Sequence, residues 1–503
     1  MKKILNYHPS KWQAISFLVI PIFIGLLTST SFDNDIWFLI NTGRYILNHG
    51  FPTIDPFTIH EGFCLVIQQW IPDVIFYELY HFFGKIGLYL FTNFVNIYIV
   101  FITYKLLMTI TDGKRNLSIL FTFIITVFIS FSFIVSRPQI FSISFLLTEL
   151  YLLEKYEVTN NKKYLIGLPL LSILMINFHA SMWLLLFCFF IPFIVNKFSF
   201  KIGKITSDGG SKRNLIIIGI IMALCGFINP YGIHAMTYVF TSWGVPVIDQ
   251  YVSEMAVPSI HTIRGIGTFV LVFSVYLIYM LFYKKKINVR HFLLLIGTTY
   301  LALSSYRGIL FFIIAAIYPL AYYFKNHFYY IREPKNSNHY LLLFFIMTVL
   351  FIIVPTAFII KNDFIIMNSS MKNGIDQIFE LEDISKVKLY CNYGECNYAE
   401  YLGIKVYIDS RAEIFIEANN HKEDILTELY LLQNHAIYYK DFIDKYQFTH
   451  LLVKETDVLY QNLLHDDDYE IMYRGLESKT DHKFGKFSMD RWHYILFRKI
   501  ENN

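Results

Sequence analysis

The feature that most constrains the fold is a series of apolar runs, each close to the length that crosses a lipid bilayer as a helix. Such a helix needs about 20 predominantly apolar residues. Because 55% of the 503 residues are hydrophobic and only 16% are charged, one soluble core could not hold them all. The sequence therefore predicts an α-helical polytopic membrane protein with about eleven transmembrane helices. The runs lie near residues 12–31, 86–110, 117–135, 140–153, 164–178, 181–196, 214–228, 265–283, 291–305, 309–324 and 340–360.

The distribution of Lys and Arg predicts how the helices are oriented. Cytoplasmic loops of membrane proteins hold an excess of these residues. With the N-terminus in the cytoplasm, the inside loops carry most of the Lys and Arg that precede the tail, and the tail from Lys361 onward is extracytoplasmic. The basic inside loops lie at residues 114–115, 162–163, 197–213, 284–290 and 325–335. The net charge of only +4, scattered between apolar runs, argues against a nucleic-acid partner.

Two domains are predicted: a transmembrane domain over residues 1–360 and a small extracytoplasmic α/β domain over residues 361–503. The second domain alternates short strands with a helix over residues 421–446, whose apolar positions are spaced three and four apart. Cys391 and Cys396 are close enough in sequence to pair, although nothing in the sequence requires it. The strands are predicted at residues 387–391, 405–409, 449–454, 469–473 and 492–498.

The first outer loop, residues 32–85, is far longer than the other connections of the transmembrane domain. Loops of this length are usually functional or disordered, and this one is too apolar for disorder. Residues 35–48 predict an amphipathic helix on the outer membrane surface, stopped by Gly50 and Pro52. A second helix is predicted over residues 68–83.

Two carboxylates, Asp33 and Asp35, stand at the outer end of the first predicted span. Such a pair can bind a divalent cation, Mg²⁺ or Mn²⁺, whose shell phosphate oxygens complete. A carboxylate there can also accept a proton from an attacking hydroxyl. The alternative is that one of them caps the helix that follows. Both are predicted as catalytic residues and as tentative metal ligands.

Other polar residues fall in the loops on the same predicted side. Arginine at a span end suits a phosphate through bidentate contacts, although it can equally anchor a helix to lipid headgroups. The histidine is either a base or a packing residue, and Asn229 could simply form a turn. The predicted substrate-binding residues of these loops are Arg137, His179, Asn229, Tyr231, Glu254, Tyr306 and Arg307.

Several segments resemble the GT-C class of membrane glycosyltransferases, which includes oligosaccharyltransferase catalytic subunits. They are most similar to a group of bacterial GT-C-like proteins with a C-terminal extracytoplasmic domain. Many members of that group have Glu where this chain has Gln69, which puts a carboxylate role there in doubt. The matching stretches are residues 33–58, 69–70, 137–139, 177–179, 229–232 and 407–413. Within them, the further substrate-binding candidates are Trp37, Arg44, Asp55, Trp70, Asp409 and Arg411.

The resemblance implies a glycosyltransferase in the bacterial plasma membrane that takes a sugar from a polyprenyl-phosphate donor. The acceptor would be an extracytoplasmic cell-envelope polysaccharide, lipid or protein. A non-catalytic envelope-glycan assembly factor and a lipid or sugar transporter are the alternatives. Transporters usually carry ionisable residues near mid-membrane, where this chain has little besides Glu149. In the tail, Asp409 and Arg411 either approach the acceptor path or form a local ion pair.

Overall fold

The computed structural model describes residues 11–30, 32–281, 286–325, 369–475 and 493–500. The chain divides into two compact units. The helical unit comprises Met1–Thr30, Phe83–Val239 and Ser253–Asp363. The loop–tail unit comprises Ser31–Phe82, Phe240–Val252 and Phe364–Asn503, so the first outer loop groups with the tail.

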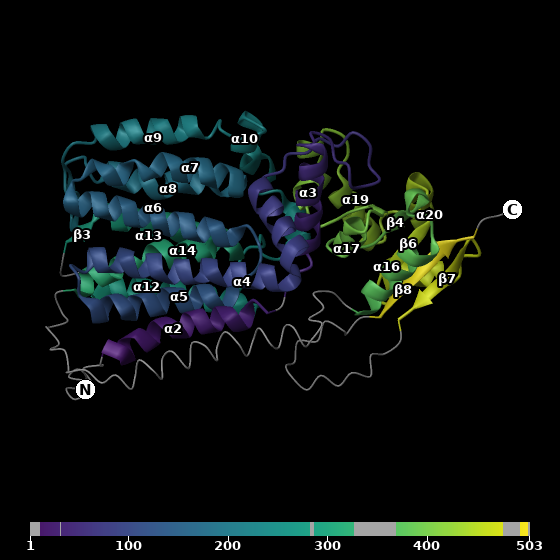
Figure 1. Cartoon of the computed structure of the whole chain (residues 1–503), viewed down its shortest axis with the longest axis horizontal. Coiled ribbons are helices and arrows are strands. Elements are labelled where there is room, and N and C mark those ends of the chain that lie inside the picture. The colour runs from purple at the N-terminus through teal and green to yellow at the C-terminus, as the bar shows by residue number, and fades with distance from the viewer. Residues whose placement is uncertain (1–10, 31, 282–285, 326–368, 476–492, 501–503) are drawn as a thin grey trace. The chain divides into compact units, whose positions relative to one another are not determined.

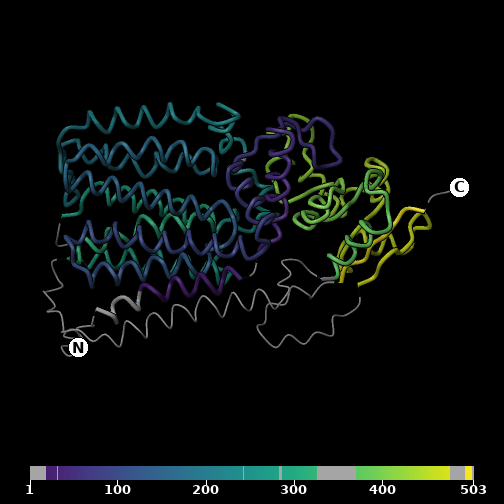
Figure 2. The backbone as a smooth tube through the Cα atoms, viewed as in Figure 1, coloured from purple at the N-terminus to yellow at the C-terminus, as the bar shows by residue number. Residues whose placement is uncertain are grey.

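The helical unit is a set of apolar helices that run side by side (Figure 1). Most helices that are neighbours in space are not neighbours along the chain. Each helix contacts the next in the order α2, α5, α14, α13, α8, α6, α7 and α9. Figure 2 shows these helices following nearly parallel paths. Their bounds are α2 Lys11–Thr28, α4 Trp70–Ile110, α5 Arg115–Ser132, α6 Gln139–Thr159, α7 Gly167–Phe178, α8 Trp183–Val195, α9 Arg213–Cys225, α10 Ile233–Ser242, α12 Ile263–Leu281, α13 Val289–Ser304 and α14 Ile309–Phe324.

Each of the first ten predicted apolar runs contains a helix, while the run at 340–360 lies outside the described residues. By length and composition, four described helices can cross a membrane: Trp70–Ile110, Arg115–Ser132, Ile263–Leu281 and Tyr306–Phe324. Further apolar helices are shorter. These helices suggest a membrane protein, and the predicted total of about eleven spans stays a prediction.

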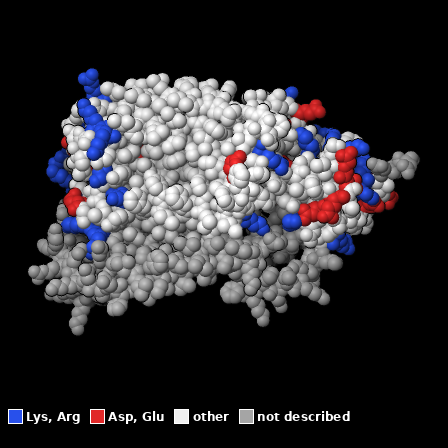
Figure 3. Space-filling model, viewed as in Figure 1, with Lys and Arg blue, Asp and Glu red and all other residues white. Residues whose placement is uncertain are grey.

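The loops of the helical unit fall into two sets, as alternating spans require. Loops predicted to be cytoplasmic contact one another: Arg290 bonds Glu154 at 3.1 Å and Asp208 at 2.9 Å. There Lys201–Ile202 (β1), Ile205–Thr206 (β2) and Ile287–Asn288 (β3) form a small sheet in the order β1-β2-β3. Figure 3 shows Lys and Arg gathered at this end, while the visible flank of the helices is almost uncharged. An uncharged flank between charged ends is what a bilayer requires.

The first outer loop of the loop–tail unit begins with the predicted helix, α3 (Ile36–His49), which ends at Gly50 with φ 83°. Most of α3 is buried, and it packs against α17 (Asn397–Tyr401) of the tail. The predicted polar face is therefore not solvated throughout, since Asn41 is buried against Glu400. The second predicted helix is the first part of α4, which contains a non-helical residue at Gly84.

The tail forms a mixed five-stranded sheet in the order β5-β4-β6-β8-β7. β4 pairs in parallel with β5 and β6, whereas β8 pairs antiparallel with β6 and β7. Every predicted strand overlaps an observed one. The strands are β4 Lys388–Tyr390, β5 Lys405–Val406, β6 His450–Lys454, β7 Tyr469–Arg474 and β8 Tyr494–Lys499.

The single helix predicted over 421–446 is wrong in extent, because the structure has α19 (Ile425–Gln433) and α20 (Tyr439–Tyr446) there. His435, between them, adopts φ 58°, which a continuous helix does not allow. The remaining elements of this unit are short helices. They are α11 Pro246–Tyr251, α16 Ser369–Leu381, η4 Ile384–Lys386, η5 Ala412–Phe415, α18 Glu417–Asn420 and α21 Val458–Leu463.

The first loop and the tail are joined by backbone pairing. Thr58 forms a parallel bridge with Val406 at the end of β5, and Ile59 N–H donates to the Val406 carbonyl at 2.9 Å. The His60 ring contacts the Tyr407 carbonyl at 2.8 Å through Nε2. The first loop thus extends the edge of the tail sheet.

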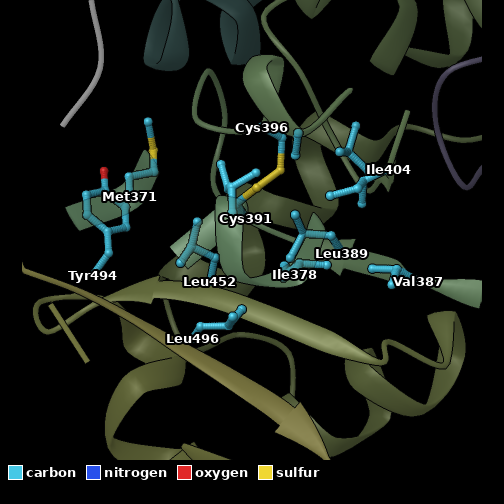
Figure 4. Packing of buried hydrophobic residues seen from close by; sticks show 13 residues of the cluster. Met371, Ile378, Val387, Leu389, Cys391, Cys396, Ile404, Leu452, Tyr494 and Leu496 are labelled. Atoms are coloured by element: carbon cyan, nitrogen blue, oxygen red, sulfur yellow. A yellow bond between two sulfur atoms is a disulfide. The ribbon is translucent and has the colours of Figure 1, made fainter. Parts of the chain in front are cut away.

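The core of the tail lies between the sheet and α16 (Figure 4). Leu389, Leu452 and Leu496, from three neighbouring strands, are fully buried in it. A disulfide joins Cys391 and Cys396 at the edge of this cluster, so the pairing that the sequence left open is present.

The closest backbone approach in the first loop predicts a sensitive position. A Cβ built on Gly43 of α3 would lie 2.1 Å from the Asp73 carbonyl oxygen of α4. We expect Gly43→Ala to lower the free energy of unfolding by about 1–3 kcal/mol, because the two helices must separate. Thermal unfolding of the detergent-solubilised protein measures the change.

Gly267→Ala in α12 is the matched control, since its Cβ would meet nothing within 4 Å. Alanine should be neutral or slightly stabilising there, by up to about 1 kcal/mol. Equal melting temperatures for Gly43→Ala and the wild type would contradict the close approach.

Candidate functional site

The predicted catalytic pair stands directly before α3. Asp33 is exposed, and its Oδ1 accepts the Asp35 backbone N–H at 3.3 Å. Asp35 occupies the cap position of α3, but its side chain makes no capping hydrogen bond. The Asp33 contact is of the kind that the capping alternative expects, and the catalytic role of both carboxylates stays a prediction.

A buried charge cluster forms where the first loop meets the tail. The Arg411 guanidinium binds Asp409 through Nε at 3.1 Å and Asp55 through Nη1 at 2.9 Å. Glu400 Oε2 lies 3.9 Å from Arg411 Nη2. Thr58 completes the shell of Asp55 by donating its N–H at 3.0 Å and its hydroxyl at 2.7 Å. The structure thus forms the local Asp409–Arg411 ion pair that the sequence offered as an alternative, and it adds Asp55 from the first loop to that pair.

The pKa values of two carboxyls in this cluster, Asp55 and Glu400, are shifted in opposite directions. Burial alone would raise the pKa of Asp55, but the Arg411 charge and the Thr58 hydrogen bonds hold it below its usual value. Burial, together with the nearby Asp409 charge, raises the pKa of Glu400 well above its usual value, although Arg411 opposes this. Glu400 therefore holds a proton over a pH range in which Asp55 is ionised.

Arg44 lies beside this cluster on α3. Its Nη2 donates to Asn41 Oδ1 and to the Tyr401 carbonyl, both at 2.6 Å, and its guanidinium carbon is 4.9 Å from the centre of the Tyr401 ring. Asn41 in turn donates to Glu400 Oε1 at 2.9 Å. The predicted residue Arg44 is therefore linked to the Arg411 cluster through Asn41 and Glu400.

The two tryptophans among the predicted substrate-binding residues lie in different surroundings. Trp37 is buried among Tyr80, Tyr398 and Tyr401, with ring centres 4.9–5.7 Å away. Trp70 is half-buried and contacts Phe51 edge to face at 5.2 Å. Trp37 thus packs inside the unit, whereas Trp70 keeps part of its surface accessible.

In the helical unit, a second charged cluster joins three predicted residues. Glu254 binds Arg137 Nη1 at 3.2 Å and Arg307 Nη2 at 3.1 Å. The backbone holds Glu254 in place, since its carbonyl accepts the Arg307 N–H at 2.8 Å. Burial raises the pKa of Glu254, but Arg307 and Arg137 outweigh it and bring the pKa below its usual value. Two half-buried guanidiniums around one ionised carboxylate leave an excess of positive charge.

The other predicted residues of the helical unit have local partners. His179 is buried, and its Nδ1 lies 2.8 Å from the Ser142 hydroxyl. Asn229 bonds the Gly226 and Gly232 carbonyls at 2.7 and 3.0 Å and accepts the Tyr231 N–H at 2.8 Å, which is turn chemistry. The Tyr306 hydroxyl lies 2.6 Å from the Thr262 hydroxyl.

A metal site is not evident from clustering. Within residues the structure describes, no three His, Cys, Asp or Glu side chains form a group that could hold a metal ion. Asp33 and Asp35 supply two carboxylates, so a cation there would need further ligands from substrate or water. The predicted cation stays a prediction.

Glu400 and Lys405 are the residues that sequence reasoning did not single out. Glu400 interrupts a short segment that is otherwise aromatic and small, Asn397–Tyr401, and this was the signal available. A carboxyl in so apolar a stretch usually requires a buried partner. Its partners, however, lie in the first loop, some 359 residues away in sequence.

Comparison with known proteins identifies the fold. No family model matches the chain, and no curated protein matches it in sequence. Among solved structures it is similar to the oligosaccharyltransferase of Archaeoglobus fulgidus. The form tethered by a disulfide to an acceptor peptide with the NVT sequon aligns with a TM-score of 0.55 and 11% identity, over 88% of this chain and 69% of that chain. The apo form gives 0.54 and 12%, over 88% and 70%, and the complex with Zn and sulfate gives 0.50 and 12%, over 87% and 68%.

The likeness extends over more than two thirds of both chains. At 11–12% identity it establishes the fold alone. The predicted membership of a particular bacterial group stays a prediction.

The Arg411 cluster generates a paired stability prediction. Asp55→Asn should lower the free energy of unfolding by about 3 kcal/mol near pH 7, the low end of the range for broken buried ion pairs, because Asp409 still pairs with Arg411. Glu400→Gln should be nearly neutral at low pH, since Gln resembles the protonated acid and can still accept from Asn41. Thermal unfolding of the full chain in detergent at several pH values measures both.

The pH dependence has a definite sign. Because folding raises the pKa of Glu400, the protonated Glu400 side chain contributes to the free energy of unfolding. This contribution is fully present below the ordinary pKa of 4.5 and is lost as the pH rises through the folded-state pKa. The stability advantage of Glu400→Gln over the wild type should therefore grow with pH. The exposed Glu455→Gln is the control and should show no such trend. An advantage independent of pH would show that Glu400 is already ionised in the folded protein.

Proposed function

We propose that this chain is a membrane glycosyltransferase that moves a sugar from a polyprenyl-phosphate donor to an extracytoplasmic cell-envelope acceptor. The observation that carries the proposal is the oligosaccharyltransferase fold combined with the carboxylate pair before α3, of which Asp33 is exposed and Asp35 half-buried. A fold does not determine function by itself, so the proposal depends on what these side chains can do.

The chemistry assigns a role to each charged group. An acceptor hydroxyl loses its proton to Asp33 or Asp35 as its oxygen bonds the anomeric carbon of the sugar. The bond between that carbon and the phosphate oxygen breaks, and polyprenyl phosphate leaves with the electron pair. Positive charge stabilises the leaving phosphate, and an arginine can supply it through bidentate contacts. A divalent cation held by Asp33 and Asp35 would add to that charge.

The disulfide supports an extracytoplasmic position for the loop–tail unit. Disulfides persist in oxidising compartments and are rare in the cytosol, and Cys391–Cys396 lies in this unit. The gathering of Lys and Arg at one end of the helical unit supports a cytoplasmic position for that end. Both observations agree with a cytoplasmic N-terminus and an active site outside the cell.

Substitution of the carboxylates tests the reaction. We expect Asp33→Asn or Asp35→Asn to reduce transfer by at least about 100-fold, the contribution typical of a general base. Asn keeps the shape of Asp and caps helices about as well, so folding should be unaffected. The measurement is mass spectrometry of envelope glycans and lipid-linked sugars in cells that lack the protein and are complemented with each variant.

Asp467→Asn serves as the control, because Asp467 is an exposed carboxylate elsewhere in the same unit. It should restore the wild-type glycan profile. Full complementation by both Asp33→Asn and Asp35→Asn would reject catalysis by this pair. It would instead favour an assembly factor or a transporter.

Cysteine labelling tests the orientation. In a background with Cys64, Cys188 and Cys225 replaced by serine, Lys422→Cys should react with an impermeant maleimide in intact cells. Lys201→Cys should react only after permeabilisation. Both positions are exposed, so a difference in labelling reports the side of the membrane. Protection of Lys422→Cys in intact cells would place the tail in the cytoplasm and overturn the proposed location.

A further inference from the structure

A pocket of about 200 Å³ lies within the loop–tail unit, between α3 and the residues around β5. Its lining includes Arg44 and Tyr45 from α3, Phe57 from the first loop, and Glu400 and Lys405 from the tail. This volume is well above the roughly 30 Å³ share of one water molecule and below the roughly 300–1,000 Å³ of drug-sized sites. The size suits one sugar residue.

The pocket carries positive charge. Arg44 and Lys405 are positively charged side chains. Glu400 is the acidic residue among those that line the pocket, and it is buried. Burial raises the pKa of Glu400, and Asn41 already occupies its Oε1 as a donor. Two cations beside a single buried carboxyl favour an anionic ligand.

Arg44 is prearranged to receive that anion. Its Nη2 is fixed by Asn41 Oδ1 and the Tyr401 carbonyl, and its plane is held near the Tyr401 ring. Among the described residues, no hydrogen bond is found for its Nε or Nη1, so these groups can each donate to an oxygen of a carboxylate or phosphate. Lys405 is exposed, and its Nζ donates to the carbonyl of Pro56, another residue of the lining.

Aromatic rings and side-chain amides also line the pocket. Tyr45 contacts Phe57 edge to face at 5.3 Å and stacks on His49 at 4.6 Å. Such rings offer an apolar surface to the C–H face of a sugar, and the exposed Asn48 offers an amide to its hydroxyls. A few polar groups on an apolar wall are typical of small-molecule sites.

We infer that this pocket binds an anionic sugar residue, with its acidic group on Arg44 and Lys405 and its ring against Tyr45 and Phe57. The inference deepens the proposed function, on which it rests, because it makes an anionic glycan the substrate class. The acidic group can be a carboxylate, as in a uronic acid, or a phosphate.

Saturation-transfer NMR on the full chain in detergent tests the inference with four probes: glucuronate, glucose 6-phosphate, glucose and acetate. We expect one or both anionic sugars to bind at least tenfold more tightly than glucose and acetate. Which of them binds more tightly separates carboxylate from phosphate. Acetate binding as strong as that of the sugars would indicate an unspecific anion site and overturn the proposal, as would equal affinity for glucose.

Variants locate the binding. Lys405→Glu should weaken binding of the anionic sugar at least tenfold, and because Lys405 is exposed, this change should leave the fold intact. Arg44→Gln should weaken it further, with thermal unfolding as a check on structure. Lys388→Gln, an exposed lysine of β4 outside the lining, is the matched control and should bind as the wild type does. Unchanged affinity in Lys405→Glu and Arg44→Gln would overturn the assignment.

The two proposals fail separately. A protein that transfers sugar in cells but binds no anionic sugar contradicts the pocket assignment and leaves the glycosyltransferase intact. An Asp33→Asn protein that binds glucuronate normally and still transfers at the full rate contradicts the catalytic assignment and leaves the pocket intact.

Discussion

The buried guanidinium of Arg411 is the group on which the loop–tail unit most depends, because a charge taken out of water is costly unless it is paired. Its partners come from two distant parts of the chain: Asp55 from the first loop, and Asp409 and Glu400 from the tail. The first loop pairs Asp55 with a guanidinium of the tail, while the tail also pairs Arg411 with its own Asp409. The same requirement positions α3, since Asn41 and Arg44 reach the cluster through Glu400 and Tyr401.

The helical unit is under a different constraint, because the flank of its helices must be apolar. Its charged clusters accordingly lie at the two ends of the helices. At one end Arg290 is held between Glu154 and Asp208 with other polar groups around it. At the other, Arg137 and Arg307 share the single carboxylate of Glu254. The first cluster sets two carboxylates around one guanidinium, whereas the second sets two guanidiniums around one carboxylate and keeps surplus positive charge. That difference is why the second is the better candidate for contact with a phosphate.

Local patterns were sufficient to predict most elements but not their long-range partners. Apolar runs and period-two segments located ten helices and all five tail strands, because these depend on neighbouring residues. Loop alternation predicted that Arg137, Glu254 and Arg307 lie on one side of the membrane, but it did not predict the ion pairs between them. Residues such as Trp37 showed the limit: an exposed stacking ring and a buried packing ring give the same local signal. Asp55 and Arg411 are 356 residues apart, and the sequence around each residue does not indicate the other as its partner. Glu400 was missed because its partners are also distant in sequence.

The joining of the first loop to the tail has a consequence for biosynthesis. At about 5–20 residues per second, Arg411 is made roughly 20–70 s after Asp55. During that interval α3 and the chain around it exist without the strand edge and counter-charge that complete their fold. The first loop must therefore wait outside the ribosome in an unfinished state, and contacts of such long sequence separation fold slowly once available. A nascent chain interrupted before its last hundred residues would lose the first loop as well as the tail.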